Sequence, residues 1–203
     1  MRSVRFVLAF ALAFAIGVVA SGCGSEVASA PEQPSASPRE QLVASPPEPP
    51  NYSGLEVHSL AQDGFSIGVP KGWTTTTAAP FKLMAADRDA ETCACSTVSV
   101  MAFPLNDAWK ENFADAGGFA EGAAAQALPG TTPTSTPVKT PVAEGVRVTL
   151  RTMLPGSDAE VVMTQNYIHT AETVYVVSYT TSPEMVKNHS GLFNRSVQSL
   201  RET

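Results

Sequence analysis

Residues 146–180 read VRVTLRTMLPGSDAEVVMTQNYIHTAETVYVVSYT, and this stretch decides the fold. Apolar residues from Val146 to Leu150 alternate with Arg147 and Thr149, which is the pattern of a strand with one buried and one wet face. Two further strand-like segments follow, and short runs of turn-forming residues separate all three. We therefore expect an antiparallel meander. Its strands are predicted at residues 146–154, 161–169 and 174–180.

A C-terminal amphipathic helix follows the meander. Ser182, Pro183 and Glu184 have the order of a helix cap, a first-turn proline and a first-turn acid. Apolar and aromatic residues then recur at helical spacing and predict a buried stripe. The stripe consists of Met185, His189, Leu192, Phe193, Val197 and Leu200.

Upstream of the meander, three shorter segments read as strands. Residues 55–60 are the first, and Phe65–Val69 is the second, followed by Pro70 and the pair Gly72-Trp73. Residues 97–103 form the third, with Val98, Val100 and Ala102 on one face.

A helix is predicted in mid-chain, from Leu105 to Leu128. Asn106 or Asp107 is suited to cap its start, and the pair Gly117-Gly118 is expected to break it into two pieces. Residues 131–141 are rich in threonine and proline and are expected to form a polar loop. The predicted fold class is α+β, an antiparallel sheet with a mid-chain helix and a C-terminal helix packed on it.

The N-terminus has the layout of an export signal. Arg2 and Arg5 precede an apolar run over residues 6–20, which is shorter than the roughly 20 residues that a membrane-spanning helix needs. Ala20-Ser21-Gly22 precedes Cys23 and resembles the bacterial lipobox, with alanine in place of the usual leucine. We expect a signal peptide at residues 1–22 and fatty acyl chains (palmitate) on Cys23. The alternative is an ordinary secretory signal that ends near a cysteine.

Residues 23–50 are predicted to be a lipidated cysteine and a disordered tether. Seven prolines lie between Gly24 and Pro50, and few large apolar residues accompany them. Removal of Arg2 and Arg5 with the signal peptide shifts the net charge from −6 to −8. An acidic body cannot hold anionic lipid headgroups through a basic patch, so the lipid itself must anchor the chain.

Residues 51–203 are long enough for one folded domain. The acidic balance, with 13 Lys+Arg against 19 Asp+Glu, argues against nucleic-acid binding. A hydrophobic content of 43% argues against a wholly disordered chain.

The order of elements resembles the PsbP-like fold, and in particular the LpqN/LpqT-type lipoproteins of actinobacteria. The resemblance rests on Phe65–Trp73, on Val174–Thr180, and on the helix that ends with Leu192-Phe193, Val197 and Leu200. It implies a binding or accessory role in the cell envelope. It implies no shared catalytic centre.

No catalytic motif is present in the sequence. His58, His169 and His189 lie outside any HExxH or zinc-ligand spacing, and there is no GxSxG, P-loop or GxGxxG motif. We expect His189 to be packed on its helix and His169 to be solvated at a strand end. The sequence therefore predicts no catalytic residues, no metal and no cofactor, and it leaves the ligand-binding residues unknown.

Cys93 and Cys95 are the remaining local oddity. In an exported protein two thiols tend to oxidise, but Cα atoms two residues apart in a strand lie about 6.6–6.8 Å from each other. This distance is near the upper limit for a disulfide, so a bond requires a turned backbone. A small disulfide, a redox or metal pair and two unpaired thiols all remain open.

Two functions are compatible with these observations. The first is a non-catalytic module on the outer face of the cell membrane that binds an envelope protein, a lipid or a glycan. The second is a lipid-anchored hydrolase or thiol-redox protein without a recognisable motif. Trp73 and Trp109 could line an apolar ligand groove beneath a helix, with core packing as the alternative.

Overall fold

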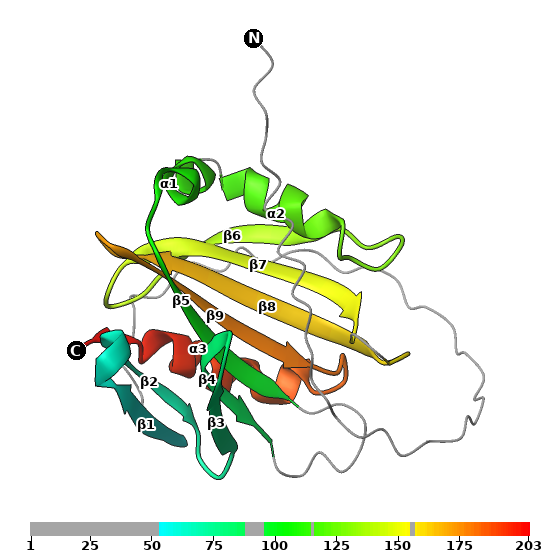
Figure 1. Ribbon diagram of the computed structural model, residues 1–203. Coiled ribbons are helices and arrows are strands. Elements are labelled where there is room, and N and C mark those ends of the chain that lie inside the picture. The colour runs from blue at the N-terminus through cyan, green and yellow to red at the C-terminus, as the bar shows by residue number, and fades with distance from the viewer. Residues whose placement is uncertain (1–52, 88–95, 115, 155–156) are drawn as a thin grey trace, which may run out of the picture. The chain divides into compact units, whose positions relative to one another are not determined.

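The predicted meander lies at the centre of an antiparallel sheet in the computed structural model of the chain (Figure 1). The structure describes residues 53–87, 96–114, 116–154 and 157–203. The three meander strands lie close to their predicted positions. They are β7 (Glu144–Met153), β8 (Glu160–His169) and β9 (Thr173–Thr181).

Four more strands complete a seven-stranded sheet in the order β3-β4-β5-β9-β8-β7-β6. A second sheet has three strands in the order β1-β2-β10. All recorded strand pairs are antiparallel, which confirms the α+β class with antiparallel sheets. The additional strands are β1 (Leu55–Leu60), β2 (Phe65–Pro70), β3 (Thr74–Ala78), β4 (Phe81–Ala86), β5 (Thr97–Pro104), β6 (Thr134–Lys139) and β10 (Arg201–Glu202).

One face of the seven-stranded sheet packs against helix α3 (Val186–Gln198) and strand β2, and we call it the α3 face. Val98 and Val100 of β5 lie on this face opposite Tyr179 and Val177 of β9. Phe65 of β2 meets the ring of Tyr175 on β9 edge-on, with the ring centroids 5.5 Å apart. The core therefore lies between the large sheet on one side and α3 with the small sheet on the other.

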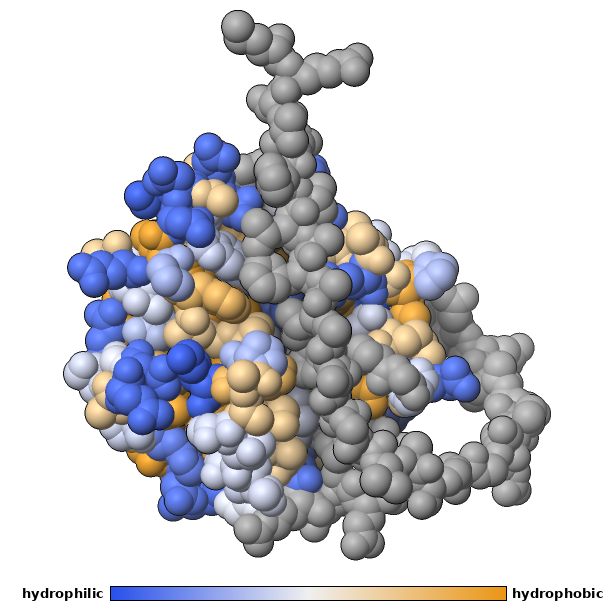
Figure 2. All heavy atoms as spheres, in the orientation of Figure 1, coloured by the Kyte–Doolittle hydropathy of each residue, from blue (hydrophilic) through white to orange (hydrophobic). Residues whose placement is uncertain are grey.

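Helices α1 (Asp107–Ala114) and α2 (Ala116–Ala124) lie on the other side of the large sheet. Figure 1 shows them beside β6 and β7, and α2 contacts both strands. In Figure 2 the outer surface of α1, at the upper left, is largely hydrophilic. Its one buried residue is Trp109.

Two serines near the end of α3 bind the backbone of β2. Gly68 donates its N–H to Ser199 Oγ at 2.6 Å, and Ser196 Oγ donates to the Gly68 carbonyl oxygen. Strand β10 pairs with Ser66 through Arg201, so Ser199 lies where the next partner of β2 would stand. Side chains of the helix thus replace a strand along this part of the edge of β2.

Four strands of the structure were not predicted as strands from the sequence. β3 and β4 fill the segment between Trp73 and the predicted third strand, and β10 follows α3. The expected polar loop at residues 131–141 is wrong, because Thr134–Lys139 forms β6 and pairs with β7. β6 is an edge strand with mostly exposed side chains, and its Pro137 is tolerated at such an edge.

Two helices, α1 and α2, lie in the segment of the predicted mid-chain helix. The expected break at Gly117-Gly118 is wrong, because both glycines lie inside α2. Asn106 caps α1, since its Oδ1 accepts a hydrogen bond from the N–H of Trp109 at 3.0 Å.

The predicted cap of the C-terminal helix is wrong. α3 begins at Val186 after a turn in which the N–H of Met185 donates to the carbonyl oxygen of Ser182 at 3.1 Å. Met185 occupies the N-cap position, and no side chain caps the helix there. Ser182, Pro183 and Glu184 therefore form the turn that precedes the helix.

Candidate functional site

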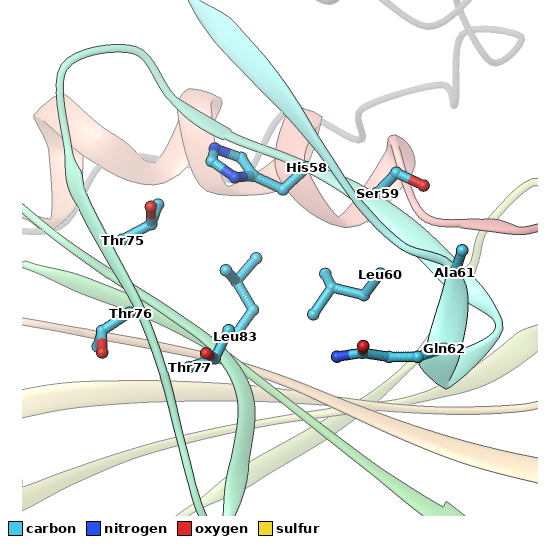
Figure 3. A pocket seen from close by; sticks show the side chains of 9 residues that line it. All are labelled: His58, Ser59, Leu60, Ala61, Gln62, Thr75, Thr76, Thr77 and Leu83. Carbon is cyan, nitrogen blue, oxygen red and sulfur yellow. The ribbon is translucent and has the colours of Figure 1, made fainter.

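A cavity of about 590 Å³ lies between β1 with the short 3-10 helix that follows it and β3 (Figure 3). Within the described ranges each of these strands lies at the edge of its own sheet, and side chains of both line the cavity. The lining residues are His58, Ser59, Leu60, Ala61, Gln62, Thr75, Thr76, Thr77 and Leu83.

The cavity has an apolar floor and hydrogen-bonding walls. Leu60 and Leu83 are buried, and Figure 3 shows their side chains pointing into the cavity between His58 and Gln62. His58 shares the inner face of its sheet with Ile67, and its buried Nε2 has no hydrogen-bond partner. The lining carries no carboxylate, lysine or arginine, so it is suited to neutral polar groups such as peptide amides or hydroxyls.

A second polar group lies on the α3 face. Ser96 Oγ lies 2.7 Å from Thr181 Oγ1 and 2.9 Å from His189 Nδ1. The rings of Trp73 and Tyr179 surround His189, with centroids 5.9 and 6.4 Å from the imidazole. Burial raises the pKa of Tyr179, and the hydroxyls of Thr181 and Ser96 partly offset this effect.

Ser96 and His189 have the side-chain groups of a catalytic nucleophile and its general base, but their surroundings differ from those of a catalytic pair. Ser96 is only 3% exposed, and its hydroxyl is shared with Thr181. Among the residues that the structure describes, no carboxylate is recorded as a partner of His189. As it stands, the pair joins β5 and β9 to α3 rather than presenting an accessible hydroxyl.

An aromatic cluster lies under α1 and α2, on the opposite face of the sheet. Trp109 lies 6.1 Å from both Phe103 and Tyr167, measured between ring centroids. The ring centroids of Phe113 and His169 lie 4.3 Å apart. His169 was expected to be solvated, but it is half-buried and packs against α1. Phe119 of α2 packs against Tyr167, with the ring centroids 4.7 Å apart and the ring planes tilted by 42°.

The two tryptophans do not line a common groove. Trp73 packs against the core beside His189 on the α3 face, whereas Trp109 belongs to the aromatic cluster on the other face. Of the two roles considered for them, core packing is therefore the one that both side chains have. The sequence did not indicate the cavity at His58, because its opposite wall is β3.

Alkaline pH should destabilise the protein through Tyr167. Its hydroxyl donates to Gln165 Oε1 at 2.9 Å, and burial raises its pKa from 10.0 to about 12. The unfolded state therefore loses this proton first, so stability is full below pH 10 and falls as the pH rises toward 12. The loss is about 1.4 kcal/mol per pH unit in this window, up to about 3 kcal/mol.

Urea unfolding between pH 9 and pH 12 measures this loss. Tyr167→Phe should flatten the slope, while Tyr175 and Tyr179, whose pKa values are also raised by burial, keep part of it. A slope that is identical in the wild type and in Tyr167→Phe would contradict the assignment.

The other predicted site residues lie outside the described residues. Cys23, Cys93 and Cys95 are among them, so the lipid attachment and the state of the cysteine pair stay predictions. Within the described ranges, no group of three His, Cys, Asp or Glu residues is arranged to hold a metal ion. No helix in those ranges has the length and hydrophobicity to span a membrane.

No protein-family model matches the chain, and no curated protein matches it either. Solved structures with similarity to it include the cyanobacterial PsbP (CyanoP) of Synechocystis sp. PCC 6803, with a TM-score of 0.48, 11% identity, and coverage of 74% of this chain and 93% of that one. LpqN of Mycobacterium tuberculosis, described as involved in cell envelope biogenesis, has a TM-score of 0.48, 10% identity, and coverage of 68% and 83%. A putative regulator of Pseudomonas aeruginosa has a TM-score of 0.42, 14% identity, and coverage of 73% and 97%.

Proposed function

We propose that this chain is an exported lipoprotein whose body acts as a non-catalytic binding or accessory module on the outer face of the cell membrane. One observation carries the proposal. The apolar run of residues 6–20 ends at three small residues, and Cys23 follows them at once. A lipid on this cysteine would hold the tether and the folded body at the membrane.

The cavity between β1 and β3 supports a binding role for the body. It is open, it has hydrogen-bonding walls, and it is lined by strands that lie at the edges of the two sheets in the described part of the chain. Beside it, the core residues of the α3 face are closely packed, with exposures of 0–8%. This combination favours contact with another envelope protein over carriage of a lipid in the interior.

Cys23→Ala should release the chain from the membrane and abolish its labelling by radioactive palmitate. Each buried lipid methylene contributes about 0.8 kcal/mol, so loss of the acyl chains removes most of the membrane affinity. The measurement is the share of the chain in washed membranes of a bacterium that processes lipoproteins, together with the label. Cys93→Ala is the matched control and should keep both.

A wild-type chain without palmitate label, or one whose mature form retains residues 1–22 by mass, would refute the anchoring. The non-catalytic part of the proposal has a separate test. It is contradicted by hydrolysis of a simple ester that disappears in Ser96→Ala while the variant keeps its fold. Thiol exchange by the purified chain that depends on Cys93 would contradict it as well.

A further inference from the structure

Arg147 occupies an unusual position on the α3 face of β7. Its Nε donates to Asn166 Oδ1 at 2.8 Å. Asn166 is fully buried and donates its own Nδ2 to the carbonyl oxygen of Val177 at 3.3 Å. The guanidinium carbon lies 6.0 Å from the centroid of the Phe193 ring on α3. These contacts hold the guanidinium in one orientation.

This cation has no counter-ion in the part of the chain that the structure describes. The only acid on β7 is Glu144, which pairs with Lys139, and the only acid on β8 is Glu160, which pairs with Arg151. Arg147 itself makes no recorded ion pair. It is half-buried, and burial lowers its pKa, so its charge is less well solvated than that of an exposed arginine.

The free end of the guanidinium has the geometry of an anion receptor. Nε is occupied by Asn166, and no hydrogen bond of the two Nη groups with the described residues is recorded. These two groups form the end-on fork that binds two oxygens of one carboxylate or phosphate. The hydroxyls of Thr149 and Thr164, 3.3 Å apart, lie two residues further along the same face. That separation is about 6.6–6.8 Å along a strand, within reach of the rest of a small ligand.

We propose that Arg147 is the anchor of an oxyanion-binding site on the α3 face. The site takes a ligand with a carboxylate or a phosphate group, which pairs end-on with the guanidinium. Asn166 positions the arginine, Phe193 forms one wall, and Thr149 and Thr164 supply hydroxyls to the remainder of the ligand. The site is independent of the lipid anchor and of the cavity between β1 and β3.

The test is an NMR titration of the full-length chain with sodium acetate and, separately, with inorganic phosphate. The readouts are the Nε–H signal of Arg147 and the side-chain amide of Asn166. Sodium chloride at matched ionic strength is the control for screening. We expect saturable shifts with acetate, with phosphate or with both, and none with chloride. Acetate alone identifies a carboxylate ligand, and phosphate alone identifies a phosphorylated one.

Three variants show whether the effect belongs to this side chain. Arg147→Gln should weaken binding at least about tenfold, and Arg147→Lys should weaken it too, because an ammonium lacks the fork. In Arg147→Gln and Arg147→Lys, binding is followed through the NMR signal of the Asn166 side-chain amide. Arg151→Gln makes the same charge change on the same strand and should leave the affinity nearly unchanged. The absence of saturation with either anion would overturn the proposal, and so would equal weakening in Arg147→Gln and Arg151→Gln.

Discussion

Gly145→Ala is expected to destabilise the protein more than any other single methyl addition to a described glycine. A Cβ at this position would lie 2.0 Å from the carbonyl oxygen of Tyr167 and 3.0 Å from the Cα of Ile168. Both atoms belong to the backbone of β8, which pairs with β7 from Gly145↔Ile168 to Met153↔Glu160 and on its other side with β9, so it cannot easily shift away. We expect a loss of about 3 kcal/mol, at the upper end of the usual cost of overpacking.

The measurement is the free energy of unfolding from urea titration at neutral pH. For a chain of this size, the expected loss corresponds to a decrease in Tm of about 6–12 °C. Gly122→Ala is the matched control, because a Cβ there meets nothing within 4 Å and the residue lies in α2. This control should gain about 0.5–1 kcal/mol, since alanine favours a helix. Equal stability of the two variants would contradict the steric argument.

Ser199→Ala is expected to cost about 1–3 kcal/mol, the price of leaving a buried N–H without a partner. Ser199 Oγ accepts the hydrogen bond of Gly68 N–H and donates to the carbonyl oxygen of Ser196 at 2.5 Å. Ser199 is 3% exposed, so water has little access to the Gly68 N–H, which would lose its hydrogen-bond acceptor in the variant.

Ser190→Ala makes the same substitution at an exposed position of α3. Its hydroxyl makes only a long hydrogen bond of 3.4 Å to the carbonyl oxygen of Lys187. We expect the stability of this control to stay within about 0.5 kcal/mol of the wild type. The measurement is the free energy of unfolding of Ser199→Ala and of Ser190→Ala, each compared with the wild type. If Ser199→Ala were as stable as Ser190→Ala, the serine contacts would not hold the small sheet in place.

The parts of the fold that bury a regular pattern of side chains could be predicted from the sequence. β1 is predicted at its observed bounds, and the meander is predicted because Val146–Leu150 alternates with polar residues and turn-forming residues separate the two apolar segments that follow. β3 could not be predicted in this way. Its sequence, Thr74 to Ala78, is exposed throughout, so only pairing with β4 makes it a strand. The same reason explains β6, where pairing with β7 outweighs an unfavourable pattern.

The candidate sites were harder to predict because they depend on contacts between distant segments. His58 and Thr75 come together only because two sheet edges face each other, and neither residue belongs to a motif. Arg147 reads as one of several wet-face residues in the sequence. Arg147 differs from Arg151 in its partner: Arg147 donates a hydrogen bond to Asn166, whereas Arg151 forms an ion pair with Glu160.

The bond between Gly68 and Ser199 also has a consequence for the kinetics of folding. It joins residues 131 positions apart in the sequence, and a contact between such distant residues requires a long loop to close, so we expect it to form late in folding. Contacts that form this late are absent from the transition state for folding, and they act mainly on the rate of unfolding. We therefore expect loss of the two serine contacts to raise the rate of unfolding and to change the rate of folding little.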